Sequence, residues 1–279
     1  MIAATPRDAN YPPRVLALEH PPDPLWIDGD PAALATRAVA IVGTRRMTAY
    51  GERVARELAS ACASAGVVVV SGFAQGVDSA AHRGALDAGG RTVAVLGEGI
   101  ALFVATVRGR RRPLVPRVRA SGALVSQYAP NFCAQPWTFV RRNATIAALA
   151  EAVVVIEAGE RSGALITAQD ARRLGRPLFA IPGPIDSSAS VGTNALIASG
   201  QARALVRADA LLEGFGPFAR AAIGPPADAV LEALAAGPLD FDALARRAGR
   251  GRAATETALA THLLDGSVVM TRDGMYRRA

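Results

Sequence analysis

Short apolar runs recur along the first three quarters of the chain, and each is followed by a turn and a segment with helical spacing. A continuous apolar run of this length is typical of a strand buried on both faces of a parallel sheet. The pattern therefore predicts an α/β fold, in which helices cover both faces of a parallel sheet. The expected strands are residues 38–42, 67–70, 92–96, 123–126, 152–156, 177–181 and 204–206. The expected helices are residues 51–65, 79–88, 143–150 and 166–174.

The two ends of the chain differ from the middle. Residues 1–38 are rich in proline and predict an extended arm with one short strand, docked on a main domain of residues 39–214. Glycine and proline mark a linker at residues 215–226. Residues 227–279 predict three short helices, with Asp240 as an N-cap, and a hairpin that turns at Asp273-Gly274. This tail is typical of a small winged-helix domain that binds DNA, but its neutral charge equally favours a protein contact or dimerisation.

Positive charge is concentrated in the central part of the chain. All 31 basic side chains are arginine, against 24 acidic ones. Residues 41–224 carry 21 arginines and 12 acids, whereas the flanking segments are slightly acidic or neutral. This uneven field favours a polyanionic partner, although a basic surface that only keeps the protein soluble explains the charge equally well. Six of these arginines lie within residues 108–119, where a phosphate contact and a solvated loop are equally good interpretations.

The cysteine and histidine residues give no sign of a metal site. Cys62 and Cys133 lie far apart, and the three histidines are scattered along the chain. No apolar run approaches the roughly 18 residues of a membrane-spanning helix. We therefore expect a cytoplasmic protein without a metal, a cofactor or a membrane partner.

Residues 70–86 form the most informative segment. A buried strand runs into Ser71-Gly72, and a helical segment begins a few residues later. In an open α/β sheet, ligands bind in the turns after the strands, and small residues at a helix start favour a phosphate. Ser71 and Gly72 are therefore predicted to contact phosphate. Asp78 is interpreted as a helix cap, and His82 as a packed residue rather than a catalyst.

Another glycine turn follows the strand at residues 38–42. Gly43 lets the backbone approach a phosphate closely, and Thr44 and Arg45 offer hydrogen-bond donors. The turn has neither the GxGxxG spacing of a dinucleotide-binding fold nor the spacing of a P-loop. The next strand also ends without the acidic residue that would bind a ribose. These features disfavour a nucleotide cofactor.

Later segments repeat the same chemistry. Residues 139–143 place an aromatic ring beside paired arginines, which suits the bases and phosphates of single-stranded nucleic acid, although a core phenylalanine beside solvated arginines is a simpler alternative. Residues 162–167 and 192–194 follow two further strands and offer hydroxyl and backbone donors. Because four strand-to-turn elements share one sheet edge, we expect a long groove rather than a single nucleotide pocket. The candidate contacts from these segments are Phe139, Arg141, Arg142, Asn143, Ser162, Gly163, Thr167, Gly192, Thr193 and Asn194.

Together these motifs resemble the DNA processing protein A family, also called DprA or Smf. The resemblance covers residues 11–212, and the tail is similar to the family's winged-helix module. It implies an extended Rossmann-like fold that binds single-stranded DNA without catalysis, forms a homodimer and hands the strand to a RecA-type recombinase in natural transformation. The chain is expected to lack the helical domain that many members carry ahead of the arm. The matching stretches are residues 42–45, 71–86, 162–168, 182–183 and 192–194.

The sequence also departs from the family pattern. Two positions that are usually arginine are neutral here, at Gln75 and Ala144. The family's acidic residues are replaced at Ala101 and Gln127, and its Tyr-Pro pair is replaced by Phe103-Val104. These departures indicate a divergent member, in which Arg141 and the arginines of residues 108–119 are candidates for compensating positive charge.

The leading functional hypothesis is a non-enzymatic binder of single-stranded DNA that protects incoming DNA and helps to load the recombinase. The alternative is a nucleotide-binding or nucleotide-hydrolysing enzyme of the related lysine-decarboxylase-like group. That group requires a Pro-Gly-Gly-x-Gly-Thr loop followed by a catalytic glutamate, and Pro182-Gly183-Pro184 interrupts the loop here. A third hypothesis is an assembly module whose tail binds a protein.

Overall fold

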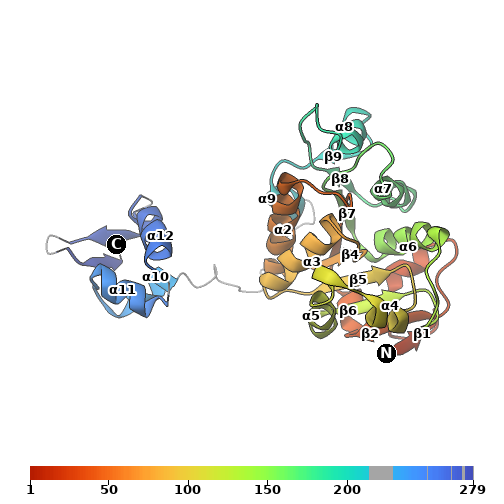
Figure 1. Ribbon diagram of the computed structural model, residues 1–279, viewed down its shortest axis with the longest axis horizontal. Coiled ribbons are helices and arrows are strands. Elements are labelled where there is room, and N and C mark those ends of the chain that lie inside the picture. The colour runs from red at the N-terminus through yellow and green to blue at the C-terminus, as the bar shows by residue number, and fades with distance from the viewer. Residues whose placement is uncertain (214–228, 250, 265, 272–273, 279) are drawn as a thin grey trace. The chain divides into compact units, whose positions relative to one another are not determined.

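The computed structural model describes residues 1–213, 229–249, 251–264, 266–271 and 274–278. The chain divides into two compact units, Met1–Ala221 and Ala222–Ala279, and each is described by itself (Figure 1). The expected linker at residues 215–226 lies outside the described residues, as does Asp273 of the expected hairpin turn.

The first unit is built on a nine-stranded sheet with the order β1-β2-β6-β5-β4-β3-β7-β8-β9. The seven strands from β6 to β9 in this order are parallel, and the strands β1 and β2 join one edge in antiparallel fashion. The α/β fold class expected from the sequence is therefore confirmed. The strands are β1 (Ile2–Ala4), β2 (Leu25–Gly29), β3 (Ala38–Val42), β4 (Val68–Ser71), β5 (Thr92–Leu96), β6 (Ala123–Ser126), β7 (Ala152–Val155), β8 (Leu178–Ala180) and β9 (Arg203–Ala204).

Helices cover both faces of the sheet (Figure 1). Alternate residues of each central strand enter different cores: Ala40 and Val42 pack with α6, α7 and the N-terminal arm, whereas Val39 and Ile41 pack with α2, α3 and α9. Burial on both faces explains why these strands read as continuous apolar runs. The helices are α1 (Ala32–Ala35), α2 (Ala49–Ser64), α3 (Val77–Asp87), α4 (Ile100–Thr106), α5 (Leu114–Ser121), α6 (Pro136–Leu149), α7 (Ala164–Arg173), α8 (Val191–Ala198) and α9 (Ala208–Glu213).

Helix α6 begins seven residues before the predicted start at residue 143. Pro136 occupies the first helical turn, where its missing N–H costs no hydrogen bond. Gln135 and Thr138 form a capping box around this start, and the Thr138 hydroxyl also donates to the Gly97 carbonyl at 2.5 Å. The longer helix matters for the site, because it places Phe139 within the first turns of α6.

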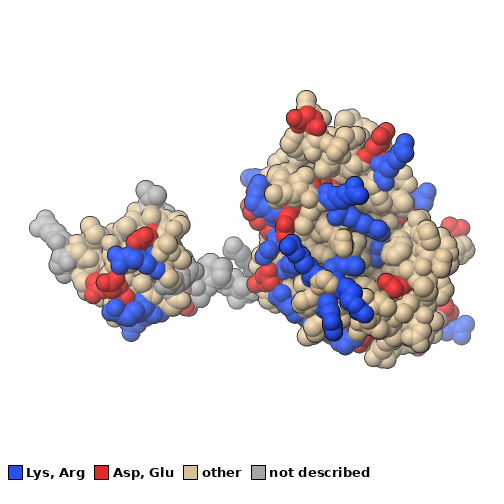
Figure 2. All heavy atoms as spheres, in the orientation of Figure 1, with Lys and Arg blue, Asp and Glu red and all other residues tan. Residues whose placement is uncertain are grey.

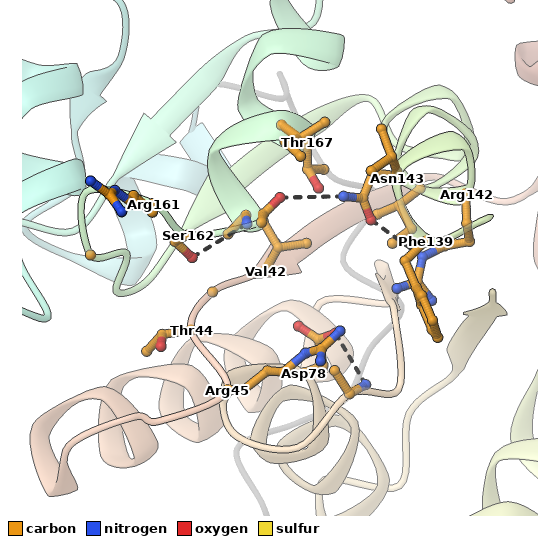
Figure 3. A pocket seen from close by; sticks show the side chains of 18 of the residues that line it. Val42, Thr44, Arg45, Asp78, Phe139, Arg142, Asn143, Arg161, Ser162 and Thr167 are labelled. Carbon is orange, nitrogen blue, oxygen red and sulfur yellow. Dashed lines mark hydrogen bonds between the residues drawn. The ribbon is translucent and has the colours of Figure 1, made fainter. Parts of the chain in front are cut away.

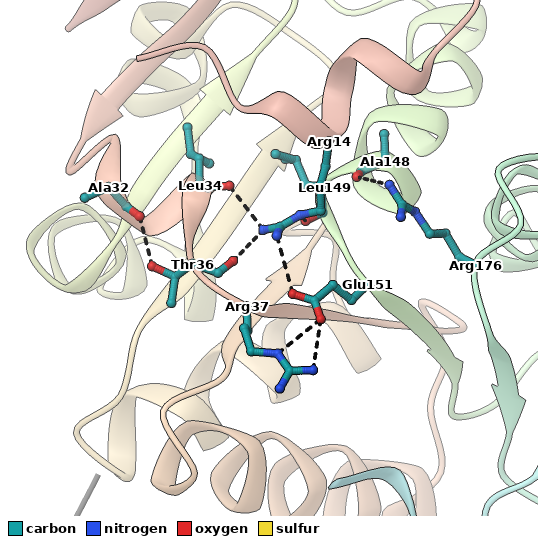
Figure 4. Close-up of polar contacts among 9 residues, drawn as sticks. All are labelled: Arg14, Ala32, Leu34, Thr36, Arg37, Ala148, Leu149, Glu151 and Arg176. Atoms are coloured by element: carbon teal, nitrogen blue, oxygen red, sulfur yellow. Dashed lines mark hydrogen bonds and ion pairs between the residues drawn. The ribbon is translucent and has the colours of Figure 1, made fainter. Parts of the chain in front are cut away.

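The N-terminal arm is integrated more deeply than the sequence indicates. It contributes two strands instead of one, together with the 3-10 helix η1 (Pro13–Ala17) and α1. Arg14 of η1 reaches across to the end of α6 and to the segment before β3 (Figure 4). Its guanidinium donates to the carbonyls of Leu149, Leu34 and Thr36 and pairs with Glu151 at 3.4 Å. This side chain therefore links η1 to the end of α6 and to the segment before β3, in addition to the strand pairing of β2 with β6.

The second unit has a small core of its own, which includes Val230, Leu244 and Leu259. Asp240 caps the second helix by accepting a hydrogen bond from the Ala243 N–H at 2.7 Å, which confirms the expected N-cap. The order of three helices and an antiparallel hairpin agrees with the expected elements, and the winged-helix interpretation stays a prediction. The elements are α10 (Ala229–Ala233), η3 (Leu234–Ala236), α11 (Phe241–Arg247), α12 (Arg252–Leu264), β10 (Val268–Met270) and β11 (Tyr276–Arg278).

Replacing Arg14 tests this attachment of the arm. We expect Arg14→Ala to lower the free energy of unfolding by about 2–3 kcal/mol, because several carbonyls lose their donor at once. Urea denaturation measures the change. Arg7→Ala is the matched control, since Arg7 is exposed and its loss changes stability by no more than about 0.5 kcal/mol. Equal stability of the two variants would contradict the role given to Arg14.

Candidate nucleic-acid interface

The strand order places a crevice at the carboxyl end of β3. β3 pairs in parallel with β4 on one side and with β7 on the other. The chain runs from β3 through β4 and β5 to β6, and then returns across the sheet to β7. The loops after β3 and β7 leave neighbouring strands toward opposite faces, and ligands bind at such a topological switch point in open α/β sheets.

A pocket of about 440 Å³ occupies this position (Figure 3). The loop after β3 supplies Thr44, Arg45 and Arg46, and the loop between β7 and α7 supplies Arg161 and Ser162. On the face shown in Figure 2, basic side chains gather around a hollow in the first unit. The expected site residues that line the pocket are Gly43, Thr44, Arg45, Phe139, Arg142, Asn143, Ser162, Gly163 and Thr167.

Hydrogen bonds between loops hold the floor of the pocket. The Thr44 N–H donates to the Glu157 carbonyl at 2.7 Å, which joins the loops after β3 and β7. The buried Glu157 carboxylate accepts from the N–H and the hydroxyl of Thr48, at 2.9 and 2.5 Å. Gly76 has a φ of +79°, and a Cβ there would lie 2.3 Å from the Thr44 carbonyl oxygen. The glycine is therefore required where the loops after β3 and β4 touch.

Arg142 is a buried part of the scaffold. Its side chain is 5% exposed, and its guanidinium donates to the Gly72 carbonyl at 2.8 Å and to the Val95 carbonyl. Burial lowers the pKa of Arg142 to about 10, an effect that the nearby Asp78 carboxylate opposes. We expected a direct phosphate donor here. The structure instead makes Arg142 a tie between the ends of β4 and β5, with one edge of its side chain on the pocket wall.

Phe139 forms the wall between the main pocket and a smaller one. The smaller pocket has a volume of about 350 Å³ and is lined by residues that include Gly72, Gln75 and Glu98. The guanidinium carbons of Arg45 and Arg142 lie 5.7 and 5.8 Å from the centre of the Phe139 ring. These cation–π contacts place a partly exposed aromatic face and positive charge in the same cavity.

Asp78 does not cap α3 as the sequence predicts. Gly76 is the N-cap, and Asp78 lies in the first helical turn, where its carboxylate accepts from the Ala74 N–H at 3.2 Å. Asp78 is 6% exposed. Burial raises the pKa of its carboxyl group, and the positive charge of Arg142 opposes this rise. The N-cap is Gly76 rather than Asp78 because α3 begins at Val77, two residues before the predicted start at residue 79.

Polar side chains on the opposite wall are held by the α7 start. The Ser162 hydroxyl accepts from the Ala164 N–H at 3.4 Å, and the Asn143 amide donates to the Gly163 carbonyl at 3.3 Å (Figure 3). Thr167 lines the pocket although only 2% of the residue is exposed. The α6 and α7 sides of the pocket are therefore connected to each other.

Five other expected contacts lie elsewhere. Ser71 is fully buried, and its hydroxyl donates to the Ile41 carbonyl at 2.7 Å, so it is not available to phosphate. Arg141 lies on another surface of α6. Gly192, Thr193 and Asn194 lie in the first turn of α8: the Gly192 N–H donates to the Ala158 carbonyl at 2.7 Å, and Asn194 exchanges hydrogen bonds with the Gly183 backbone. The pocket lining draws on the turns after β3, β4 and β7 and not on the element after β8, and the long groove stays a prediction.

The arginines of residues 108–119 lie on α5 and in the segment between α4 and α5. Arg117 pairs with Asp87 at 2.9 Å, Arg119 pairs with Asp28 at 2.5 Å, and Arg111 donates to the Phe73 carbonyl at 3.1 Å. Their hydrogen bonds and ion pairs connect α5 to α3 and β2. These arginines form one cluster in the sequence, but in the structure they make separate contacts.

Two pocket arginines were not singled out from the sequence. Arg46 and Arg161 are exposed on the rim, each in a loop directly after a predicted strand. Their position next to Arg45 and Ser162 was the signal that could have identified them. His82, by contrast, is a packed residue as expected: it is fully buried, and its Nδ1 lies 2.7 Å from the Thr92 hydroxyl.

The described residues form neither a metal site nor a membrane-spanning helix. Among them, no group of histidine, cysteine, aspartate and glutamate side chains is arranged to hold a metal ion. None of the helices in the described part of the chain has the length and apolar character needed to cross a membrane.

Comparison with known proteins defines the family. Residues 3–216 match the sequence profile of the family described as DNA recombination-mediator protein A, and the chain belongs to this family. A DprA-type DNA processing protein of Mycobacterium tuberculosis is 43% identical over 256 residues, which cover 90% of this chain and 64% of that protein. Protein Smf of Escherichia coli is 40% identical over 68% of this chain and 50% of its own length. The chain thus spans less than two thirds of these relatives.

Solved structures agree with this assignment. DNA processing protein A from Streptococcus pneumoniae matches with a TM-score of 0.70 and 32% identity, covering 76% of this chain and 73% of that one. The protein of the same name from Helicobacter pylori, whose structure is described in terms of its single-stranded DNA binding mode, matches with a TM-score of 0.67 and 30% identity. That match covers 75% of this chain and 94% of the other.

Because Arg142 connects the ends of β4 and β5, its replacement is predicted to lower the stability of the protein substantially. We expect Arg142→Met to lower the free energy of unfolding by about 3 kcal/mol, because carbonyls lose their donor and Asp78 loses its nearby positive charge. Adding Asp78→Asn to this variant recovers part of the loss. Arg45→Met is the matched control and changes stability by no more than about 0.5 kcal/mol, since Arg45 is exposed. Chemical denaturation measures all three, and equal effects of Arg142→Met and Arg45→Met would contradict the assignment.

His82 predicts a pH dependence of stability. Burial lowers its pKa to about 3 from an ordinary value of 6.5, so between these values the unfolded chain binds a proton that the folded protein does not. The contribution to stability is complete above pH 6.5 and is lost as the pH falls toward 3. Between pH 7 and pH 5 the loss is about 2 kcal/mol. His82→Gln removes this part of the pH dependence, and an NMR titration that showed the His82 ring gaining a proton near pH 6 would refute the prediction.

Proposed function

We propose that the pocket at the carboxyl ends of β3 and β7 binds single-stranded DNA with little sequence preference. One observation supports this function most directly: three exposed arginines, Arg45, Arg46 and Arg161, surround a cavity whose wall includes the ring of Phe139. A base needs an aromatic face, and a flanking phosphate needs a cation. Membership of the recombination-mediator family and the printed description of the H. pylori structure support the same ligand.

The proposal extends to the cellular role that the family suggests. The protein protects incoming single-stranded DNA in the cytoplasm and helps to load a RecA-type recombinase during natural transformation or recombination. It acts as a homodimer and without catalysis. Family membership supports this role, and the pocket supports its DNA-binding part.

The pocket offers little to support a nucleotide-hydrolysing enzyme. Of the described residues that line it, Asp78 is the acidic one, and it lies buried against Arg142 with a raised pKa. The loop of Pro182-Gly183-Pro184, where the related hydrolases need their glycine-rich motif, does not contribute to the pocket lining. Binding, rather than hydrolysis, is therefore the function proposed.

Salt dependence tests the phosphate contacts. Binding of a dye-labelled oligo-dT, followed by fluorescence anisotropy, should weaken with salt, and each phosphate contact contributes about −0.7 to the slope of log affinity against log salt. We expect Arg45→Ala and Arg161→Ala each to make the slope less steep by about this amount. Arg7→Ala, the same loss of charge at an exposed position that does not line the pocket, leaves the slope unchanged.

The competing results are distinct. If the wild-type protein binds oligo-dT with an affinity that does not change with salt, the pocket is not a phosphate site. If all three arginine variants have the same effect, binding follows the general charge of the protein and the proposed location is wrong. A duplex of the same sequence should bind more weakly, because its bases are not free to stack on Phe139.

A further inference from the structure

An exposed aromatic surface lies on α6 just outside the pocket. Trp137 is 53% exposed and Val140, one turn further along the helix, is 47% exposed. Together the two side chains expose contiguous apolar surface, and contiguous apolar patches, unlike single exposed side chains, mark binding sites. The pocket described above does not use Trp137, because it is lined by Phe139, Arg142 and Asn143, which project from a different side of the helix.

Two other rings hold Trp137 in place. Tyr128 and Phe132 stack with ring centres 4.9 Å apart and an interplanar angle of 19°. The Trp137 ring meets both of them edge to face, at 5.9 and 6.3 Å. The Tyr128 hydroxyl donates to the Thr138 carbonyl at 3.1 Å, which fastens this cluster to the first turn of α6. The indole is therefore presented on a supported platform, with little conformational freedom left to lose on binding.

The platform is continuous with the pocket. Val140 lines the pocket and lies three residues after Trp137, so the two side chains are neighbours on the helix, about 4.5 Å apart along its axis. Arg141 lies four residues after Trp137 on the same face and is exposed. Val140 therefore lies at the edge of the pocket, and the aromatic ring of Trp137 and the cation of Arg141 lie beyond it on α6.

We propose that a nucleotide of the strand that leaves the pocket stacks its base on Trp137, and that Arg141 contacts the phosphate beside it. This proposal rests on the proposed function and adds a second base-binding position to it. The occupant is assigned as the same strand because the platform adjoins the cationic pocket and carries its own arginine. The combination of a stacking ring and a phosphate donor matches single-stranded nucleic acid.

The fluorescence of Trp137 tests the contact directly. The chain has two tryptophans, Trp26 and Trp137, so a Trp26→Phe protein reports on Trp137 alone. Oligo-dT of increasing length is added while the indole emission and the anisotropy of a dye on the oligonucleotide are both followed. We expect short strands to bind without quenching, and longer strands to quench Trp137, because only these extend from the pocket to the platform.

Variants give an independent measurement. Trp137→Ala should weaken the binding of a long strand about tenfold, whereas a strand that fills only the pocket binds as before. Trp137→Phe retains most of the affinity, and Arg141→Ala makes the salt slope less steep by about 0.7 for the long strand alone. Val206→Ala is the matched control, since Val206 is an exposed apolar side chain that does not line the pocket, and it should change neither affinity.

Each outcome gives a clear decision. Strong binding by anisotropy without quenching at any length, or equal losses for short and long strands in Trp137→Ala, would overturn the platform and leave the proposed pocket intact. Absence of binding to every strand would overturn the proposed function itself. An unchanged urea midpoint for Trp137→Ala ensures that a loss of affinity is not a loss of folding.

Discussion

The parallel pairing of β3 with both β4 and β7 is the constraint on which the rest of the first unit depends. β3 lies between β4 and β7. The connection after β3 leads to one face of the sheet and the connection after β7 leads to the other, so the two loops diverge at the carboxyl end of β3. The pocket is a consequence of this topology. Its chemistry depends on the residues in the loops, where small side chains let backbones approach and arginines supply the positive charge.

Buried polar groups make the pocket a defined shape. Arg142 joins the ends of β4 and β5, and Glu157 joins the loop after β7 to the start of α2. These contacts stabilise only if every partner is present, because a buried charge left without one is costly. The arginines of the rim differ from these residues, because their side chains are exposed and accessible to a polyanion. The site thus separates residues that form the cavity from residues that are proposed to contact the ligand.

Helix α6 connects the two binding positions inferred for the strand. Successive residues of its first turns point in different directions, so Phe139 and Arg142 face the pocket while Trp137 and Arg141 are exposed on another side of the helix. A single helix therefore sets the spacing between the two proposed base positions. Hydrogen bonds hold the start of α6 in place: the Thr138 hydroxyl donates to the carbonyl that follows β5, and the Tyr128 hydroxyl of the aromatic cluster donates to the Thr138 carbonyl.

The sequence by itself determined the fold class and most strand positions, because strands buried on both faces are recorded as apolar runs and their turns as glycines. It also identified nine of the pocket residues, since each lies near a turn after a predicted strand or near a predicted helix start. Only the tertiary structure decided which candidates share a cavity. Ser71 and Arg142 have the residue types of phosphate ligands, but burial and hydrogen bonds to carbonyls make them scaffold. Exposure and partners depend on contacts between distant segments, and these are not encoded in any local pattern.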